Sequence, residues 1–132
     1  MVMLRYLIAK DYLDCKGVVA NLKPSHDRAR LLRGTLDTLG LWNVPVGVGT
    51  DGGSNTHKST FDDTCKDYAP PRNSQRAEAI LPGRLLLQRA FSASENRSLA
   101  LICISSLKDA ALFVRDNAAL FKQKVTTLIR TK

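Results

Sequence analysis

Short apolar runs alternate along this chain with segments whose apolar residues have the spacing of a helix face. This alternation limits the possible folds more than any other feature of the sequence. The runs are rich in β-branched and aliphatic residues and are bounded by glycine, proline or polar residues, as buried strands usually are: Cys15–Leu22, Val44–Gly49, Ser98–Ser105 and the start of 124–132. Between them, apolar residues recur at steps of three and four, the spacing of one helix face. The alternation implies parallel pairing, so we predict an α/β fold with a mostly parallel, Rossmann-like open sheet of about four strands flanked by helices.

Two expected helices can be bounded from their residue types. Ser25 is placed to cap a helix that Gly40 ends, with leucines on one face and arginines on the solvent side. A second helix is expected over Ser74–Ala93. It contains Pro82, so it is expected in one piece or in two.

A single domain is expected for residues 1–132, since this length allows a sizeable core. Residues 50–75 are polar and rich in Gly, Ser, Thr, Asp and Pro, which predicts a long, mobile surface loop. The loop contains His57, Asp62, Asp63 and Cys65. Their spacing matches no metal site that we can justify, so a solvated loop is the preferred interpretation.

The stretch Val44–Gly53 contains Gly47-x-Gly49-x-x-Gly52, which matches the glycine fingerprint of dinucleotide-binding folds. That fingerprint binds phosphate because a helix N-terminus follows its glycines. No helical spacing follows the glycines here. We therefore expect them to let the chain leave the sheet at a sharp turn, and a nucleotide-binding module is the weaker alternative.

The net charge of +8 suits an anionic partner such as RNA or a protein surface. The basic residues are spread out and lack interleaved aromatic residues, so we expect solvated helix faces and no nucleic-acid partner. No apolar run reaches the roughly 18 residues of a membrane span, and no membrane partner is expected. The three cysteines lack CxxC spacing, which favours reduced thiols and an intracellular, cytoplasmic setting, with an organelle as the alternative.

A family resemblance rests on three stretches, namely "LRYLIAKDYLDCKGVVANL", "RARLLRGTLDTLGLWNVPVGVG" and "SLALICISSLKDAALFVRDNAALFKQKVTTLI". They resemble, in order, the first helix and second strand, the second helix and third strand, and a later strand and helix of the inosine–uridine-preferring nucleoside hydrolase family. The resemblance implies an internal part of that fold. For a full-length protein it implies hydrolysis of the N-glycosidic bond of ribonucleosides with calcium as cofactor.

Two positions of the family's site can be carried over to this chain. Asn21 matches the asparagine that holds the ribose, although it could instead close the turn before Pro24, the interpretation we favour here. Ile104 falls where the family donates a backbone carbonyl to calcium, although its default interpretation is a core-strand residue. The family's Gly-Pro-Leu-Thr-Asn segment has become Ser105-Ser106-Leu107-Lys108-Asp109.

The family motifs that this sequence lacks determine which function we expect. Its Asp-x-Asp-x-x-x-Asp-Asp cluster and its later His-Asp pair have no counterpart in the sequence. We therefore assign no catalytic residue and expect an incomplete domain that binds no cofactor and is inactive by itself. The alternative is a non-catalytic binding or structural subunit that uses its basic surface. Without the family's first strand, Val18–Ala20 would lack a neighbour on one side, so self-association or a protein partner at this sheet edge is expected.

Overall fold

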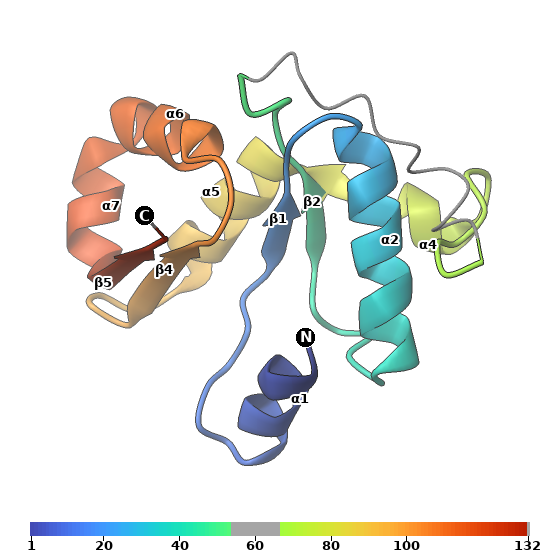
Figure 1. The fold of residues 1–132 in the computed structure, drawn as a ribbon. Helices are drawn as coiled ribbons and strands as arrows, with labels where there is room; N and C mark the ends of the chain where they lie inside the picture. The colour runs from blue at the N-terminus through green and yellow to red at the C-terminus, as the bar shows by residue number, and fades with distance from the viewer. Residues whose placement is uncertain (54–66, 132) are drawn as a thin grey trace.

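The computed structural model describes residues 1–53 and 67–131, which form an α/β fold (Figure 1). Every strand pair within these residues is parallel. The predicted fold class is therefore confirmed. The elements are α1 (Val2–Ala9), β1 (Val18–Ala20), α2 (Ser25–Thr38), β2 (Val46–Val48), α4 (Gln75–Glu78), β3 (Leu81–Pro82), α5 (Gly83–Ala93), β4 (Leu99–Cys103), α6 (Lys108–Asp116), α7 (Ala118–Lys124) and β5 (Val125–Arg130).

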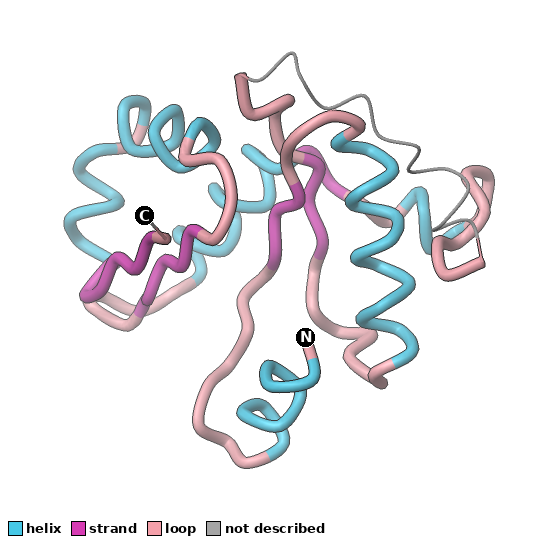
Figure 2. The backbone as a smooth tube through the Cα atoms, viewed as in Figure 1, coloured by secondary structure: helices cyan, strands magenta, loops and turns pink. Residues whose placement is uncertain are grey.

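The strands belong to two sheets, whereas the sequence predicted one open sheet. One sheet has the order β1-β2-β3 and the other pairs β4 with β5 (Figure 2). Within the described part of the chain, β1 and β4 each end a sheet and share no ladder. The two sheets are tied together beyond the carboxyl ends of these strands, where side chains bridge the turns that follow β1 and β4.

Helices cover both faces of the β1-β2-β3 sheet. On one face the core lies beside α2, which contributes Ala29 and Leu36. Alternate residues of β1 and β2 pack into this core, namely Val18, Ala20, Val46 and Val48. The opposite face meets α5 so closely that a Cβ on Gly47 would lie 2.9 Å from the Cα of Gly83. Alternation of this kind is expected for a strand covered on both faces.

The end of α2 follows the prediction, but its beginning does not. Gly40 has φ +73°, its N–H bonds the Asp37 carbonyl at 3.0 Å, and the Leu41 N–H bonds the Leu36 carbonyl at 2.8 Å. This pair of bonds is the usual glycine-terminated helix end. The prediction that Ser25 caps the helix is wrong, because Pro24 holds the N-cap position and Ser25 is the first helical residue.

The arginines of α2 do not all face solvent, which corrects the sequence prediction. Arg33 is only 4% exposed and donates hydrogen bonds to the carbonyls of Val44 and Leu41 and to the carboxylate of Asp37. The pKa of Asp37 is influenced most by burial, which raises it. The hydrogen bonds and charges of Arg76 and Arg33 together outweigh burial and lower this pKa below its ordinary value of 3.8. Arg33 thus fixes the connection from α2 to β2.

The segment expected as one or two helices over Ser74–Ala93 consists of α4, the two-residue strand β3, and α5. On α5, Phe91 is buried against Phe113 of α6, with ring centroids 4.6 Å apart, and against Phe121 of α7. These rings form the second core of the fold. Cys103 is partly buried at the end of β4, and burial raises the pKa of its thiol, which agrees with an unreactive cysteine.

Some sequence expectations lie outside the described residues. Half of the expected mobile loop 50–75 is among them, namely residues 54–66, which include His57, Asp62, Asp63 and Cys65. Its mobility and the solvated state of these side chains stay predictions. Among the described helices, none has the length and apolar character needed to cross a membrane.

Candidate functional site at the carboxyl edge

Three segments meet beyond the carboxyl ends of the strands. Asn21 follows β1, Gly49–Gly53 follow β2, and Ser106–Asp109 connect β4 to α6. Ligands of open parallel sheets bind in the crevice outside the carboxyl ends of the strands. We therefore take this carboxyl edge as the candidate site and define it by Asn21, Thr50, Asp51, Ser106, Lys108 and Asp109.

Asp109 lies at the centre of the carboxyl edge. Its Oδ1 accepts a hydrogen bond from the backbone N–H of Thr50 at 2.8 Å, and its Oδ2 accepts one from the Thr50 hydroxyl at 2.9 Å. Oδ2 also accepts a bond from Nδ2 of Asn21 at 2.9 Å. One carboxylate thus ties α6 to the turns after β1 and β2, and both of its oxygens are already engaged.

The Asn21 side chain points its amide group into the protein. Nδ2 donates to Asp109 and to the Ser106 carbonyl, each at 2.9 Å, which uses both amide hydrogens. Oδ1 accepts no hydrogen bond from a described residue. No fully buried side-chain polar atom in the described part of the chain lacks a partner, so Oδ1 is at least partly accessible to solvent. Asn21 therefore bridges two distant turns and does more than close the turn before Pro24, while its contact with ribose stays a prediction.

The glycines after β2 serve close packing and a turn. A Cβ on Gly49 would lie 2.9 Å from Cβ of Asn21 and 3.0 Å from each Asp109 carboxylate oxygen, so only glycine leaves room for the pair to meet. Gly52 and Gly53 have φ +78° and +79°, which agrees with the expected sharp turn. Whether a helix follows them lies outside the described residues.

A second interaction borders the carboxyl edge. Lys108 Nζ lies 2.8 Å from Asp51 Oδ1, and this hydrogen bond is the main cause that lowers the pKa of Asp51 below its ordinary value of 3.8. The Ser106 hydroxyl donates to the Gly52 carbonyl at 3.0 Å and accepts from the Lys108 N–H at 3.2 Å. Ser106, Lys108 and Asp109 therefore belong to a connected polar network.

Ile104 directly follows β4 and is 74% exposed, so its interpretation as a core-strand residue is wrong. Calcium needs about six to eight oxygen ligands. The described residues contain no group of three or more His, Cys, Asp or Glu side chains that could hold a metal ion. Asp109, at the same edge, already accepts three hydrogen bonds. The described residues therefore do not fit calcium, and the role of the Ile104 carbonyl stays a prediction.

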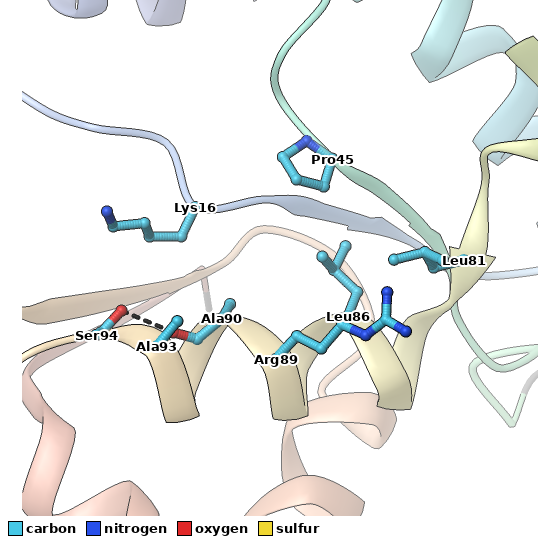
Figure 3. Close-up of a pocket in the computed structure, with 8 residues that line it drawn as sticks. All are labelled: Lys16, Pro45, Leu81, Leu86, Arg89, Ala90, Ala93 and Ser94. Atoms are coloured by element: carbon cyan, nitrogen blue, oxygen red, sulfur yellow. Dashed lines mark hydrogen bonds between the residues drawn. The ribbon is translucent and has the colours of Figure 1, made fainter.

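A groove of about 300 Å³ lies elsewhere, at the amino ends of β1 and β2 (Figure 3). Its walls are mainly apolar and come from Lys16, Pro45, Leu81, Leu86, Arg89, Ala90, Ala93 and Ser94. The Ser94 hydroxyl is already bonded to the Ala90 carbonyl. The other polar lining side chains are the two cations Lys16 and Arg89, whereas polar groups from three segments converge at the carboxyl edge, which remains the better candidate.

Sequence reasoning identified Asn21 but missed Thr50 and Asp109. Their positions could have identified them, since Thr50 comes shortly after the glycine-rich strand and Asp109 lies in the first turn of α6, the helix that follows β4. Residues at such positions form the carboxyl edge of a parallel sheet. A search for polar residues after each strand and at the start of the next helix would have found both.

No family model matches the sequence, and no curated protein matches it. The fold is similar to that in "The crystal structure of type III effector protein XopQ complexed with adenosine diphosphate ribose", with a TM-score of 0.72 and 20% sequence identity. The match covers 97% of this chain and 37% of that chain, so this chain spans little more than a third of its neighbour. At this identity the likeness shows the fold alone, an α/β fold of the kind that the family resemblance implies.

Proposed function

We propose that this chain is a nucleoside hydrolase-like domain that binds a ribose-bearing ligand at its carboxyl edge and does not cleave the N-glycosidic bond by itself. The observation that carries the proposal is the solvent-accessible Oδ1 of Asn21, which accepts no hydrogen bond from a described residue and belongs to an amide group whose two hydrogens both bond within the protein. An acceptor of this kind suits the hydroxyl groups of a ribose. The structural neighbour XopQ was crystallised with adenosine diphosphate ribose, a compound of the same class, which supports the proposal.

Charge at the carboxyl edge favours hydroxyl groups over phosphate. Lys108 is paired with Asp51, and the charge of Lys23 also lowers the pKa of Asp51, whereas the hydrogen-bond partners of the Asp109 carboxylate are all neutral. A phosphate placed against Asn21 would meet that negative charge, whereas a neutral sugar hydroxyl would not. We infer that the ribose of a nucleoside or nucleotide sugar faces Asn21 and that any phosphate lies farther away.

The same contacts argue against hydrolysis by these residues. Cleavage of an N-ribosyl bond needs a carboxylate or a metal-bound hydroxide that delivers water. Asp109 accepts three hydrogen bonds from Asn21 and Thr50, and Asp51 Oδ1 accepts from Lys108 and the Gly53 N–H. Asp109 is therefore not placed as a free base, and the lowered pKa of Asp51 makes that carboxylate a weak one.

Titration calorimetry of the chain with adenosine diphosphate ribose and with inosine tests the proposal. We expect saturable binding that Asn21→Ala weakens at least about tenfold, a loss of about 1.4 kcal/mol, because it removes the accessible acceptor. The matched control Asn96→Ala changes an exposed asparagine before β4 and should bind as the wild type does. A free-ribose assay on the same inosine mixture should stay at the buffer blank. No binding by the wild type, equal binding by Asn21→Ala, or ribose release would contradict the proposal.

A second candidate function, a subunit that pairs with another strand, is favoured by the free sheet edges. β1 ends the three-stranded sheet, and β4 is paired on one side only among the described residues. Beside that edge Ile102 is 57% exposed and Ile104 is 74% exposed. Exposed apolar edges favour pairing with a further strand, and the net charge of +8 opposes association only until salt screens it.

Light scattering at low and at physiological salt tests this second function. We expect self-association that increases with salt and that Ile102→Lys reduces by placing a charge beside the edge. Val2→Lys adds the same charge at an exposed position of α1 and should leave the association unchanged. A sharp monomer mass for the wild type at both salt concentrations, with cooperative thermal unfolding, would rule out self-association through this edge.

A further inference from the structure

We infer that Asp109 is the positioning residue of the carboxyl edge, because it holds the Asn21 amide by Nδ2 in the orientation that leaves Oδ1 free to accept from a ligand. The effect of Asp109 on ligand binding rests on the proposed function, whereas its hold on the Asn21 amide rests on the contacts alone. Asp109 lies 88 positions from Asn21 in the sequence and reaches it from the first turn of α6. It would act on a ligand only through Asn21.

The two orientations of the Asn21 amide differ because both of its inner partners are acceptors. Nδ2 faces the Ser106 carbonyl and the Asp109 carboxylate, each at 2.9 Å. A flipped amide would place Oδ1 against these two acceptors and lose both bonds. A hydrogen bond to an ionised carboxylate is stronger than one to a neutral acceptor, so Asp109 contributes more to this preference than Ser106 does.

Asp109 is itself held rigidly by Thr50. The Thr50 N–H and hydroxyl each donate to one of its carboxylate oxygens, at 2.8 and 2.9 Å. The Thr50 carbonyl in turn accepts the N–H of Leu22, the residue after Asn21, at 3.0 Å. These contacts close a ring through the two strand ends and α6. The direction of the Asn21 amide is therefore set by the ring as a whole, with the carboxylate at its centre.

Asp109→Asn tests the inference, because it keeps the shape of the side chain but replaces one acceptor oxygen with a donor. The first readout is hydrogen exchange of the Asn21 side-chain amide, followed by nuclear magnetic resonance without ligand. We expect slow exchange in the wild type and fast exchange in the variant. The second readout is the affinity for adenosine diphosphate ribose, which should fall at least about tenfold. Asp116→Asn, the same change at the end of α6, should alter neither.

Thr50→Val is the second variant, for the case in which Asp109→Asn does not fold. It removes the hydroxyl bond to Asp109 and keeps the backbone N–H, so Asn21 exchange should increase to an intermediate rate. Unchanged Asn21 exchange in the folded variants would overturn the role of Asp109. A wild type that binds no ribose-bearing ligand but shows Asn21 protection that depends on Asp109 would instead contradict only the proposed function.

Discussion

Replacement of Arg33 by methionine is expected to lower the free energy of unfolding by about 3–5 kcal/mol. The Arg33 side chain is 4% exposed and donates to two backbone carbonyls, of Val44 and Leu41, and to Asp37. Methionine fills similar space but removes the Arg33 donor from the Val44 carbonyl, leaves the Leu41 carbonyl with the Val44 N–H as its donor, and removes one of the cations beside the Asp37 carboxylate. Losses of this size are a large part of the 5–15 kcal/mol that stabilise an ordinary domain.

Urea unfolding followed by circular dichroism measures the effect of Arg33→Met. The control is Arg115→Met, because Arg115 is also a helix arginine paired with an aspartate but its side chain is exposed. An exposed ion pair contributes about 0–1 kcal/mol, so this variant should unfold close to the wild type. Equal unfolding midpoints for the two variants would show that the contacts of Arg33 do not hold α2 to β2.

Replacement of Phe91 by alanine is expected to cost about 3–5 kcal/mol. Phe91 is buried and packs against Phe113 and Phe121, so truncation would remove its ring contacts with α6 and α7 and leave a cavity. Phe91→Leu should cost less, because leucine fills part of that space.

Thermal or urea unfolding of the Phe91 variants gives the comparison. Tyr12→Ala is the control, since it truncates an aromatic side chain that is 73% exposed and should change stability by less than about 0.5 kcal/mol. A loss for Phe91→Ala no larger than that for Tyr12→Ala would mean that the three rings do not form a core.

Local signals predicted much of this fold. Gly40 ends α2 at the expected residue, and the apolar run around Ala100 forms β4. Pairing between distant strands was harder to predict. β3 consists of Leu81 and Pro82 alone and is defined by its pairing with Gly47 and Val48, not by its own residue types. Proline lacks an N–H donor and is seldom expected inside a sheet, so sequence patterns gave no reason to place a strand there.

The candidate site was predicted only in part, for a related reason. Asn21 was identified through its match to a family position, whereas its partners Ser106 and Asp109 lie 85 and 88 positions away in the sequence. Gly49 was interpreted as part of a turn, but its main role is to leave room beside Asn21 and Asp109. Hydrogen-bond partners at such separations follow from topology, which spacing along the chain does not reveal.

Binding of a ribose-bearing ligand at the carboxyl edge can be measured by titrating the ¹⁵N-labelled chain with adenosine diphosphate ribose and following the backbone amides by nuclear magnetic resonance. We predict saturable shift changes centred on the backbone amides of Asn21, Thr50, Gly52, Lys108 and Asp109, the segments that meet beyond β1, β2 and β4. Changes centred on the groove beside Leu86 and Ala90, or no saturable change at any amide, would contradict binding at the carboxyl edge.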